Sequence, residues 1–551
     1  MPGTVGGVSQ ASRSFVAGSA AIVVLAFCLR LYQLSAQELW LDEAAAWYWA
    51  TAPDWLAQTV VNNTPPLHSL LLRGWSAVAG ESQTALRLPS VLLGTGFVAA
   101  VLWAGCELFT PEVALWSALW AAVAPLHIYY SQEVRAYALL MLALLLTAAA
   151  AWRAARRDTT VAWALVSLCA TLALYSHYLA GVGVLATVAV LRLGRRPAPV
   201  RHYAIALLVS VALFVPWVVA SFLMSPHSLQ GTEWIRGMWE KIPPALAIPR
   251  SLEVFGLGSQ AGLLPLDVKQ FGMEFPTPLR YAGLAVLLGL GVWVVLPWGE
   301  AALRIADIGA RKRALGVLLF GPLLVLWCAS FWHPVYIPGR YDLVAFPAFP
   351  LWLGLALYKL QCQPRGGRWA AALVALALAV PIGAKLMWYY HPPVRSELHP
   401  TAVATAHALD ARVADGDVVI FTDLRALPVL YQLNQVGVRW HDQYCESSDG
   451  RRFGCRMFPR ETEATPAVYD PQRVLRDPGA VREDVRDILW MRRPGGSVHV
   501  VFGNYAVAHE RLAVAPVESL LVTEVQRLGF QPVATDLKLG TMQYRRVTPS
   551  P

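Results

Sequence analysis

Two adjacent carboxylates follow the first long apolar run of this chain. Asp42 and Glu43 lie in LWLDEAAAWYWA, Leu39 to Ala50, where every other residue is apolar or aromatic. In one interpretation, Asp42 caps a short helix at the membrane surface and Glu43 lies against the positive end of the helix dipole. Neighbouring helical residues point about 100° apart, so one acid could face a site while the other holds the loop. Because carboxylates are costly near a bilayer, both are candidates for function.

A second polar segment is NNTPPLHSLLLRGW, Asn62 to Trp75. Pro65 and Pro66 prevent a helix from extending backward and favour the start of a new one. His68 then lies on an otherwise apolar helix. Such a histidine is more often a hydrogen-bonded packing residue than a ligand, and we keep it as a candidate for substrate binding.

The third segment, YYSQEVRAYALL, places charges where one apolar run ends and the next begins. Glu133 and Tyr137 are four residues apart and therefore share a helical face. Glu133 and Arg135 could balance each other's charge, but residues two apart on a helix do not face each other well. A solvated turn does not need three aromatic residues around it, so Glu133, Arg135 and Tyr137 are candidates for a site.

Two further segments carry polar residues at the ends of apolar runs. His177 lies in YSHY, residues 175–178, and Arg340 and Tyr341 lie in HPVYIPGRYD, residues 333–342. Arg340 could simply extend its charged end to the membrane surface. The functional alternative is an anion clamp, because a guanidinium binds two phosphate oxygens at once.

Motifs for nucleotide donors are missing from the sequence. The DGD triplet at residues 415–417 directly precedes an expected strand, and it is interpreted as a turn rather than as a metal site. The sequence has no GxxxxGK[ST] phosphate loop. No dense cluster of Asp, Glu and His occurs in the outer segments, so we predict no cofactor; a divalent metal is the one alternative, and we do not expect it.

The elements that position these residues are membrane spans. Of the 551 residues, 56% are hydrophobic and 15% are charged, whereas an average soluble domain has about a quarter charged residues. About eleven apolar runs reach or nearly reach the length that crosses a bilayer; they lie near 14–34, 83–106, 111–130, 134–152, 160–177, 178–193, 202–223, 281–298, 314–332, 342–360 and 369–388. We therefore predict a polytopic α-helical membrane protein with about 11–13 transmembrane helices.

Basic residues give the orientation of these spans. Arg and Lys cluster in alternate loops, near residues 153–157, 192–201, 304–313 and 359–368, and such clusters stay on the cytoplasmic side. With that orientation, the outer side holds the loop 35–82, the turns at 129–135 and 176–178, the long loop 224–280, residues 333–340 and everything after about residue 390. Nearly all the candidate residues belong to this outer set. The net charge of +9 is thus explained by membrane topology rather than by nucleic-acid binding.

The part after residue 390 has the composition of a soluble domain. DVVIFT (417–422) and SVHVVF (497–502) are typical of buried strands, and helices are expected at 401–413, 424–435 and 481–489. This alternation predicts an α/β domain over residues 391–551, after a membrane domain over residues 1–390. Cys445 and Cys455 bracket a polar loop, CESSDGRRFGC, and such a pair outside the cytoplasm favours a disulfide over a metal site.

Residues 10–390 resemble the GT-C membrane glycosyltransferases. The likeness is greatest to the branch with the protein mannosyltransferases, the lipid A aminoarabinose transferases and the rhizobial lipopolysaccharide galacturonosyltransferases. The motifs that carry it are LWLDEAAAW, TPPLHSLLLRGW, RLPSVLLG and YYSQEVRAYALL. One departure is Thr64, where many relatives have a histidine or another larger polar residue. The resemblance implies transfer of a sugar from a polyprenyl-phosphate carrier to a hydroxyl acceptor on the non-cytoplasmic face.

Such a reaction needs a general base, an anion clamp and a pocket open to lipid and water. We expect a single inverting displacement in which Asp42 accepts the proton of the acceptor hydroxyl. Charge develops on the sugar as in other glycosyl transfers. Arg340, together with Arg135, Tyr341 and His177, would stabilise the departing phosphate.

The remaining acids have supporting roles in this hypothesis. Glu133 is the second carboxylate, which orients sugar hydroxyls or the acceptor. Glu43 holds the loop or a substrate hydroxyl. Adjacency alone leaves open which of Asp42 and Glu43 is the base.

Other functions stay open at this point. A membrane transporter could line its path with polar residues, although here they gather on one face and no repeat is evident. A glycan ligase that uses a polyprenyl-diphosphate donor would share the architecture. The alanine- and arginine-rich composition suggests a bacterial inner membrane, with the active site and the C-terminal domain in the periplasm and an acceptor in the cell envelope, such as lipopolysaccharide, another glycan or a protein.

Overall fold

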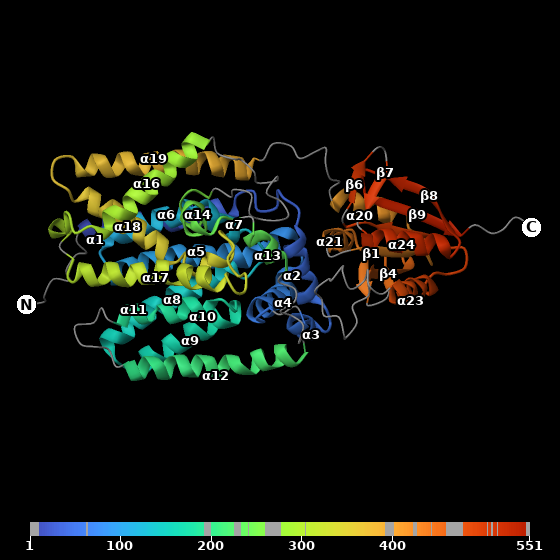
Figure 1. The fold of residues 1–551 in the computed structure, drawn as a ribbon, viewed down its shortest axis with the longest axis horizontal. Coiled ribbons are helices and arrows are strands. Elements are labelled where there is room, and N and C mark those ends of the chain that lie inside the picture. Colours follow the sequence, from blue (N-terminus) through green and yellow to red (C-terminus); the bar gives the residue numbers. More distant parts are fainter. Residues whose placement is uncertain are drawn as a thin grey trace, which may run out of the picture.

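A helical membrane domain and an α/β domain lie next to each other along the long axis of the molecule (Figure 1). The computed structural model describes residues 10–61, 64–191, 200–224, 233–240, 242–258, 277–303, 305–391, 402–422, 427–441, 444–458, 478–503, 505–508, 511–514 and 516–546. The expected outer loop 224–280 and the expected helix 424–435 therefore lie partly outside the described residues.

All the apolar runs named above fall on helices. The helical elements are α1 Gln10–Leu31, α2 Leu41–Thr51, α3 Trp55–Val61, α4 Leu67–Ala79, α5 Gln83–Leu108, α6 Pro111–Val123, α7 Pro125–Ser131, α8 Tyr137–Arg157, α9 Thr160–Ser176, α10 Ala180–Ala186, α11 Val188–Leu191, α12 Val200–Met224, α13 Glu233–Trp239, α14 Pro244–Leu257, α16 Thr277–Val295, η2 Glu300–Leu303, α17 Ile308–Ala329, η3 Tyr341–Val344, α18 Ala348–Gln361 and α19 Gly367–Tyr390.

Fewer helices reach full spanning length than the sequence indicates. Among the described residues, six helices are long and apolar enough to cross a membrane, or seven if α6 and α7 count as one bent span. The runs at 160–177, 178–193, 281–298 and 342–360 form shorter helices. In the last of these runs the α-helix begins only at Ala348, after the 3-10 turn η3, because Pro347 has no N–H with which to continue an earlier helix.

A buried arginine stabilises the break between α6 and α7, which are bent by 61°. Pro125 begins α7 and lacks the N–H that would continue α6. Arg30 at the C-terminal end of α1 donates instead to the carbonyls of Ala121 and Ala122, at 2.9 and 3.1 Å. The break directs α7 toward the turn that carries Glu133 and Arg135.

The α/β domain contains one mixed sheet and one hairpin. Its strands are β1 Val418–Thr422, β2 Arg439–His441, β3 Tyr444–Glu446, β4 Arg452–Phe458, β5 Val498–Val501, β6 Tyr505–Ala508, β7 Arg511–Val514, β8 Phe530–Asp536 and β9 Thr541–Arg546. The sheet order is β2-β3-β4-β1-β5-β9-β8, and β6 pairs with β7. β1 runs parallel to β4 and β5. The helices are α20 Ala402–Arg412, α21 Leu427–Gln435, α23 Pro478–Trp490 and α24 Pro516–Arg527.

β1 is buried on both faces, as its uninterrupted apolar sequence predicts. Val419 and Phe421 belong to one apolar cluster, together with residues of α20 and α21. Val418 and Ile420 alternate with them and belong to another cluster, together with residues of α23 and α24. The sheet therefore lies between two helical layers.

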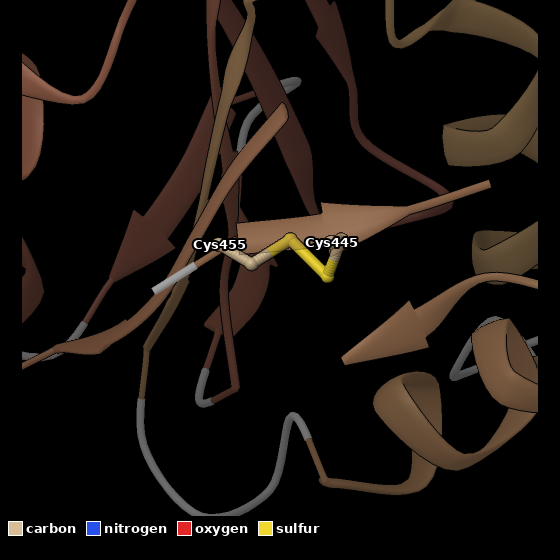
Figure 2. The surroundings of a disulfide bond; sticks show 2 residues. All are labelled: Cys445 and Cys455. Atoms are coloured by element: carbon tan, nitrogen blue, oxygen red, sulfur yellow. A yellow bond between two sulfur atoms is a disulfide. The ribbon is translucent and has the colours of Figure 1, made fainter. Parts of the chain in front are cut away.

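A disulfide joins two neighbouring strands of this sheet. Cys445 of β3 and Cys455 of β4 are bonded, with their Cα atoms 5.7 Å apart (Figure 2). β3 and β4 pair antiparallel, and β4 lies next to the central strand β1. The bond therefore links the edge strands β2 and β3 covalently to the central part of the sheet.

Candidate active site

Asp42 lies in the first turn of α2, at the end of the membrane domain nearest the α/β domain (Figure 1). The interpretation of Asp42 as the helix cap is wrong: α2 begins at Leu41, and Trp40 is the cap residue. Glu43 takes part in capping instead, because its carboxylate accepts a hydrogen bond from the Trp40 backbone N–H at 3.4 Å. The Asp42 side chain is thereby left for other partners.

Those partners are two arginines from distant parts of the chain. The Arg340 Nη2 and the Asp42 Oδ2 lie 2.6 Å apart, and the Arg135 Nη2 lies 3.7 Å from the same oxygen. Arg340 is only 8% exposed. We call Asp42, Arg135 and Arg340 the clamp side of α2.

Aromatic side chains surround the clamp side. The Arg340 Nε donates to the Tyr137 hydroxyl at 3.0 Å, and the Arg340 guanidinium lies 5.8 Å from the centre of the Tyr341 ring. The His177 ring lies 6.0 Å from that of Tyr137 and 5.7 Å from that of Tyr341. The candidates from four separated segments are thus brought together in one place.

The charges of the clamp side influence one another strongly. Burial alone would raise the pKa of Asp42, but the Arg340 and Arg135 guanidiniums outweigh it and hold that pKa below its usual value. Burial lowers the pKa of His177 to about 4, and the two arginines add to this effect. Near neutral pH the clamp side therefore has an ionised Asp42 and two cations, which leaves one positive charge in excess, and the neighbouring His177 is neutral.

A tight turn presents Arg340 to Asp42. Gly339 has a φ of +76°, and a Cβ there would lie 2.8 Å from Val254, so only glycine fits without strain. The Tyr130 hydroxyl donates to the Gly339 carbonyl at 2.5 Å. Asp342 follows in η3, and burial raises its pKa to about 7. No pattern in the sequence predicted these roles of Tyr130 and Asp342.

Glu43 points away from the clamp side. Its two oxygens accept from the Arg87 Nε and Nη2 at 2.8 and 2.6 Å, and one also accepts from the Val134 backbone N–H at 3.0 Å. Arg87 donates further to the backbone carbonyls of Leu34 and Gln37. We call Glu43, Arg87 and Val134 the brace side, because this network ties α2 to α5 and to the turn before α8.

Arg87 was not among the residues predicted from the sequence. The only available signal was the position of Arg87 as a lone charge in RLPSVLLG, which enters an apolar run. Because a charge in such a position needs a partner, a search for an opposite charge at the same membrane depth could have found the pair.

Glu133 lies behind the brace side in a small polar cavity of about 50 Å³ that Glu43, Arg87 and Tyr129 also line. Neither Glu133 carboxylate oxygen accepts a hydrogen bond of ordinary length from the described residues, although Tyr129 lies close enough to lower its pKa. Burial and the Glu43 charge outweigh that effect and raise the pKa of Glu133 to about 8. Glu133 is therefore protonated near neutral pH.

His68 lies on α4, close enough to the clamp side to interact with Arg135. Burial, reinforced by the Arg135 charge, lowers the pKa of His68 to about 3. It is neutral at physiological pH and can offer one donor and one acceptor to a ligand.

Comparisons with known proteins bear on this arrangement. Residues 63–219 match the family described as dolichyl-phosphate-mannose-protein mannosyltransferase. The structure is similar to that of ArnT from Cupriavidus metallidurans in the apo state, with a TM-score of 0.54 at 13% identity over 98% of this chain and 99% of the other. The fold is that of the GT-C glycosyltransferases. A comparison with curated protein sequences gives no significant match.

Two further solved structures share this GT-C fold. One is the same ArnT bound to undecaprenyl phosphate, with a TM-score of 0.53, 13% identity and the same coverage. The other is the apo oligosaccharyltransferase of Archaeoglobus fulgidus, with a TM-score of 0.51 at 11% identity over 88% of this chain and 69% of the other. The family match lies in the segment that holds His68, Glu133, Arg135 and His177.

Proposed function

We propose that this GT-C protein transfers a single sugar from a polyprenyl-phosphate carrier to a hydroxyl acceptor at the outer face of the membrane. The observation that carries the proposal is the 2.6 Å contact between Asp42 and Arg340, with Arg135 beside it. A proton acceptor and two anion-binding cations share one buried place at the end of the membrane domain. The structure of ArnT bound to undecaprenyl phosphate, which has a similar fold, supports a lipid-phosphate donor.

The proposed step is an inverting displacement. The acceptor oxygen forms a bond to the anomeric carbon while the bond from that carbon to the phosphate oxygen breaks. Asp42 takes the hydroxyl proton, and the electron pair of the broken bond leaves with the polyprenyl phosphate. Arg340 and Arg135 stabilise the charge on the departing phosphate, so the step needs no metal ion and chelation should not change it.

Asp42 and the donor phosphate compete for Arg340 in this mechanism. Without donor, Arg340 is paired with Asp42, and the lowered pKa makes this carboxylate a weak base. When the phosphate binds Arg340, Asp42 loses its closest cation and becomes more basic. The base is thereby activated only when the donor is present.

Uncharged side chains near the clamp side can form hydrogen bonds with the sugar hydroxyls. Neutral His68 and His177 can each donate and accept one hydrogen bond, whereas Glu133 lines the separate cavity behind the brace side. The two histidines orient hydroxyls without adding charge beside the reacting carbon.

The experiment that tests the proposal is mass spectrometry of envelope glycolipids and glycans from the native host. Cells that carry the wild-type gene, the Asp42→Asn gene and no gene are compared. The proposal predicts that the last two lack one sugar on one envelope component and accumulate that sugar on polyprenyl monophosphate. Loss of a whole glycan that accumulates on polyprenyl diphosphate would indicate a ligase instead, and an unchanged envelope would contradict the proposal.

A further inference from the structure

The α/β domain covers the helix that carries Asp42. α2 lies between the membrane domain and α21 (Figure 1). Ala44 and Trp47 of α2 belong to the same buried apolar cluster as Leu430 and Tyr431 of α21. The Trp47 and Tyr431 rings meet edge to face, with their centres 5.1 Å apart.

Glu81 ties α2 and α21 together. It lies in the turn between α4 and α5, and its Oε2 accepts from the Trp47 Nε1 at 2.8 Å and from the Asn434 Nδ2 at 2.9 Å. Its backbone carbonyl accepts from the Tyr431 hydroxyl at 2.9 Å. One residue of the membrane domain thus receives hydrogen bonds from α2 and from the α/β domain at the same time.

A second contact lies before the start of α2. The Glu38 carboxylate accepts from the backbone N–H of Ala402, the first residue of α20, at 2.9 Å. The first turns of a helix leave such N–H groups without intrahelical partners, so Glu38 satisfies a bond that α20 cannot make internally. The α/β domain therefore holds both the segment that leads into α2 and the middle of α2.

We infer that the α/β domain positions the catalytic base, with Glu81 as the central positioning residue. This inference rests on the proposed function of Asp42. The start of α2 is held by the Glu43–Arg87 pair, and its end by Arg73 of α4, which donates to the carbonyls of Ala50 and Ala52 at 3.0 and 2.9 Å. The Glu81 junction adds the contact at Trp47 between these two points, and its loss would let the helix tilt. A tilt would change the distance from Asp42 to Arg340, and a displacement of about 1 Å can cost about a hundredfold in rate.

The key variants are Glu81→Ala, which removes the side-chain acceptor, and Glu81→Gln, which keeps an amide oxygen for Trp47 and Asn434. Arg452→Ala is the matched control, because it removes an exposed ion pair with Glu446 and a cation–π contact with Tyr444, both inside the α/β domain and away from α2. All three are made in the full chain and purified in detergent. The kinetic donor is the polyprenyl-phosphate sugar that accumulates in cells without the gene.

We expect Glu81→Ala to lower kcat about tenfold or more while the KM for donor stays within about twofold of wild type. The acid limb of its pH–rate profile should move to higher pH, since Asp42 moves away from the arginines that lower its pKa. Hydrogen–deuterium exchange over residues 41–51 should be faster. Glu81→Gln and Arg452→Ala should behave like wild type in all three measurements.

Each contrary result has a definite meaning. An unchanged kcat and acid limb in Glu81→Ala would overturn the inference, even if exchange in α2 rises. An equal loss in Glu81→Gln would also overturn it, because the negative charge rather than the hydrogen bonds would then matter. If wild type shows no transfer, the proposed function fails, whereas unchanged exchange over α2 in Glu81→Ala would reject the positioning role independently.

Discussion

Asp42 and Glu43 are adjacent in the sequence but have opposite surroundings. Asp42 faces two arginines that are themselves candidates to bind phosphate, whereas Glu43 is 1% exposed and bound to Arg87 and a backbone N–H. The hydrogen-bond partners of Glu43 leave little freedom for proton transfer. The comparison shows how two adjacent positions in one helix can give one carboxylate partners that fit a proposed base and the other the partners of a structural brace, because consecutive side chains point in different directions.

The largest expected effect is the loss of turnover when Asp42 on the clamp side is substituted. Asp42→Asn keeps the shape of the side chain but removes the base, so kcat should fall by about 10²–10⁴-fold. The measurement is transfer by the purified variant with donor extracted from cells that lack the gene. The variant should still fold and insert, because an amide oxygen can still accept a hydrogen bond from Arg340, and turnover within tenfold of wild type would remove Asp42 from the base role.

The brace side should control stability instead. Arg87→Ala leaves Glu43 buried without its counter-ion, which costs about 3–5 kcal/mol. The thermal unfolding midpoint in detergent, followed by tryptophan fluorescence, should fall well below that of Asp42→Asn. The double variant Arg87→Met with Glu43→Gln should recover part of the loss, since no unpaired charge remains; a double variant less stable than Arg87→Ala would argue against the brace.

Next in size is the effect on binding of the carrier phosphate. Arg340→Ala removes a charge-assisted hydrogen-bond donor and should weaken undecaprenyl phosphate binding about tenfold to a hundredfold. Arg340→Lys keeps the charge and should lose less. Arg313→Ala, an exposed arginine away from the clamp side, serves as the control. Equal affinity of Arg340→Ala and the control would exclude Arg340 from the anion clamp.

The smallest effect is expected for Glu133. Its pKa is about 8, so Glu133→Gln resembles the protonated form and should keep transfer within about tenfold of wild type at pH 7.

The pH dependence of stability tests the same point. A raised folded-state pKa contributes stability that is present below the usual value of 4.5 and is lost as pH rises through about 8. The midpoint of wild type should therefore fall more than that of Glu133→Gln between pH 5 and about 9. Parallel curves for the two proteins would contradict the raised pKa.

The sequence predicted well which candidate residues lie close together, but it did not predict the contacts that hold these residues in position. Apolar runs and basic loops put the segments of Asp42, Arg135, His177 and Arg340 at the same ends of the spans, and the structure brings these residues together. Membrane topology restricts polar residues to two surfaces, so a common surface is a strong constraint. The catalytic roles themselves stay predictions.

The supporting contacts depend on tertiary packing that no local pattern encodes. Arg87 reaches Glu43 across 44 positions, and Arg30 reaches the carbonyls of α6 across more than 90. The contact of α21 with Glu81 joins the membrane domain to the α/β domain. These two parts of the chain differ in composition, and neither sequence indicates a contact with the other. Pairing between such distant residues needs the fold, because sequence periodicity describes only faces within one element.

The affinity of undecaprenyl phosphate for Asp42→Asn tests most directly whether base and clamp form one site. If Asp42 and phosphate compete for Arg340, removal of the carboxylate charge should make the purified variant bind the carrier more tightly, by about fivefold or more, although its turnover is expected to fall. Weaker or unchanged binding would show that the Asp42 charge does not compete with phosphate, and it would contradict the account.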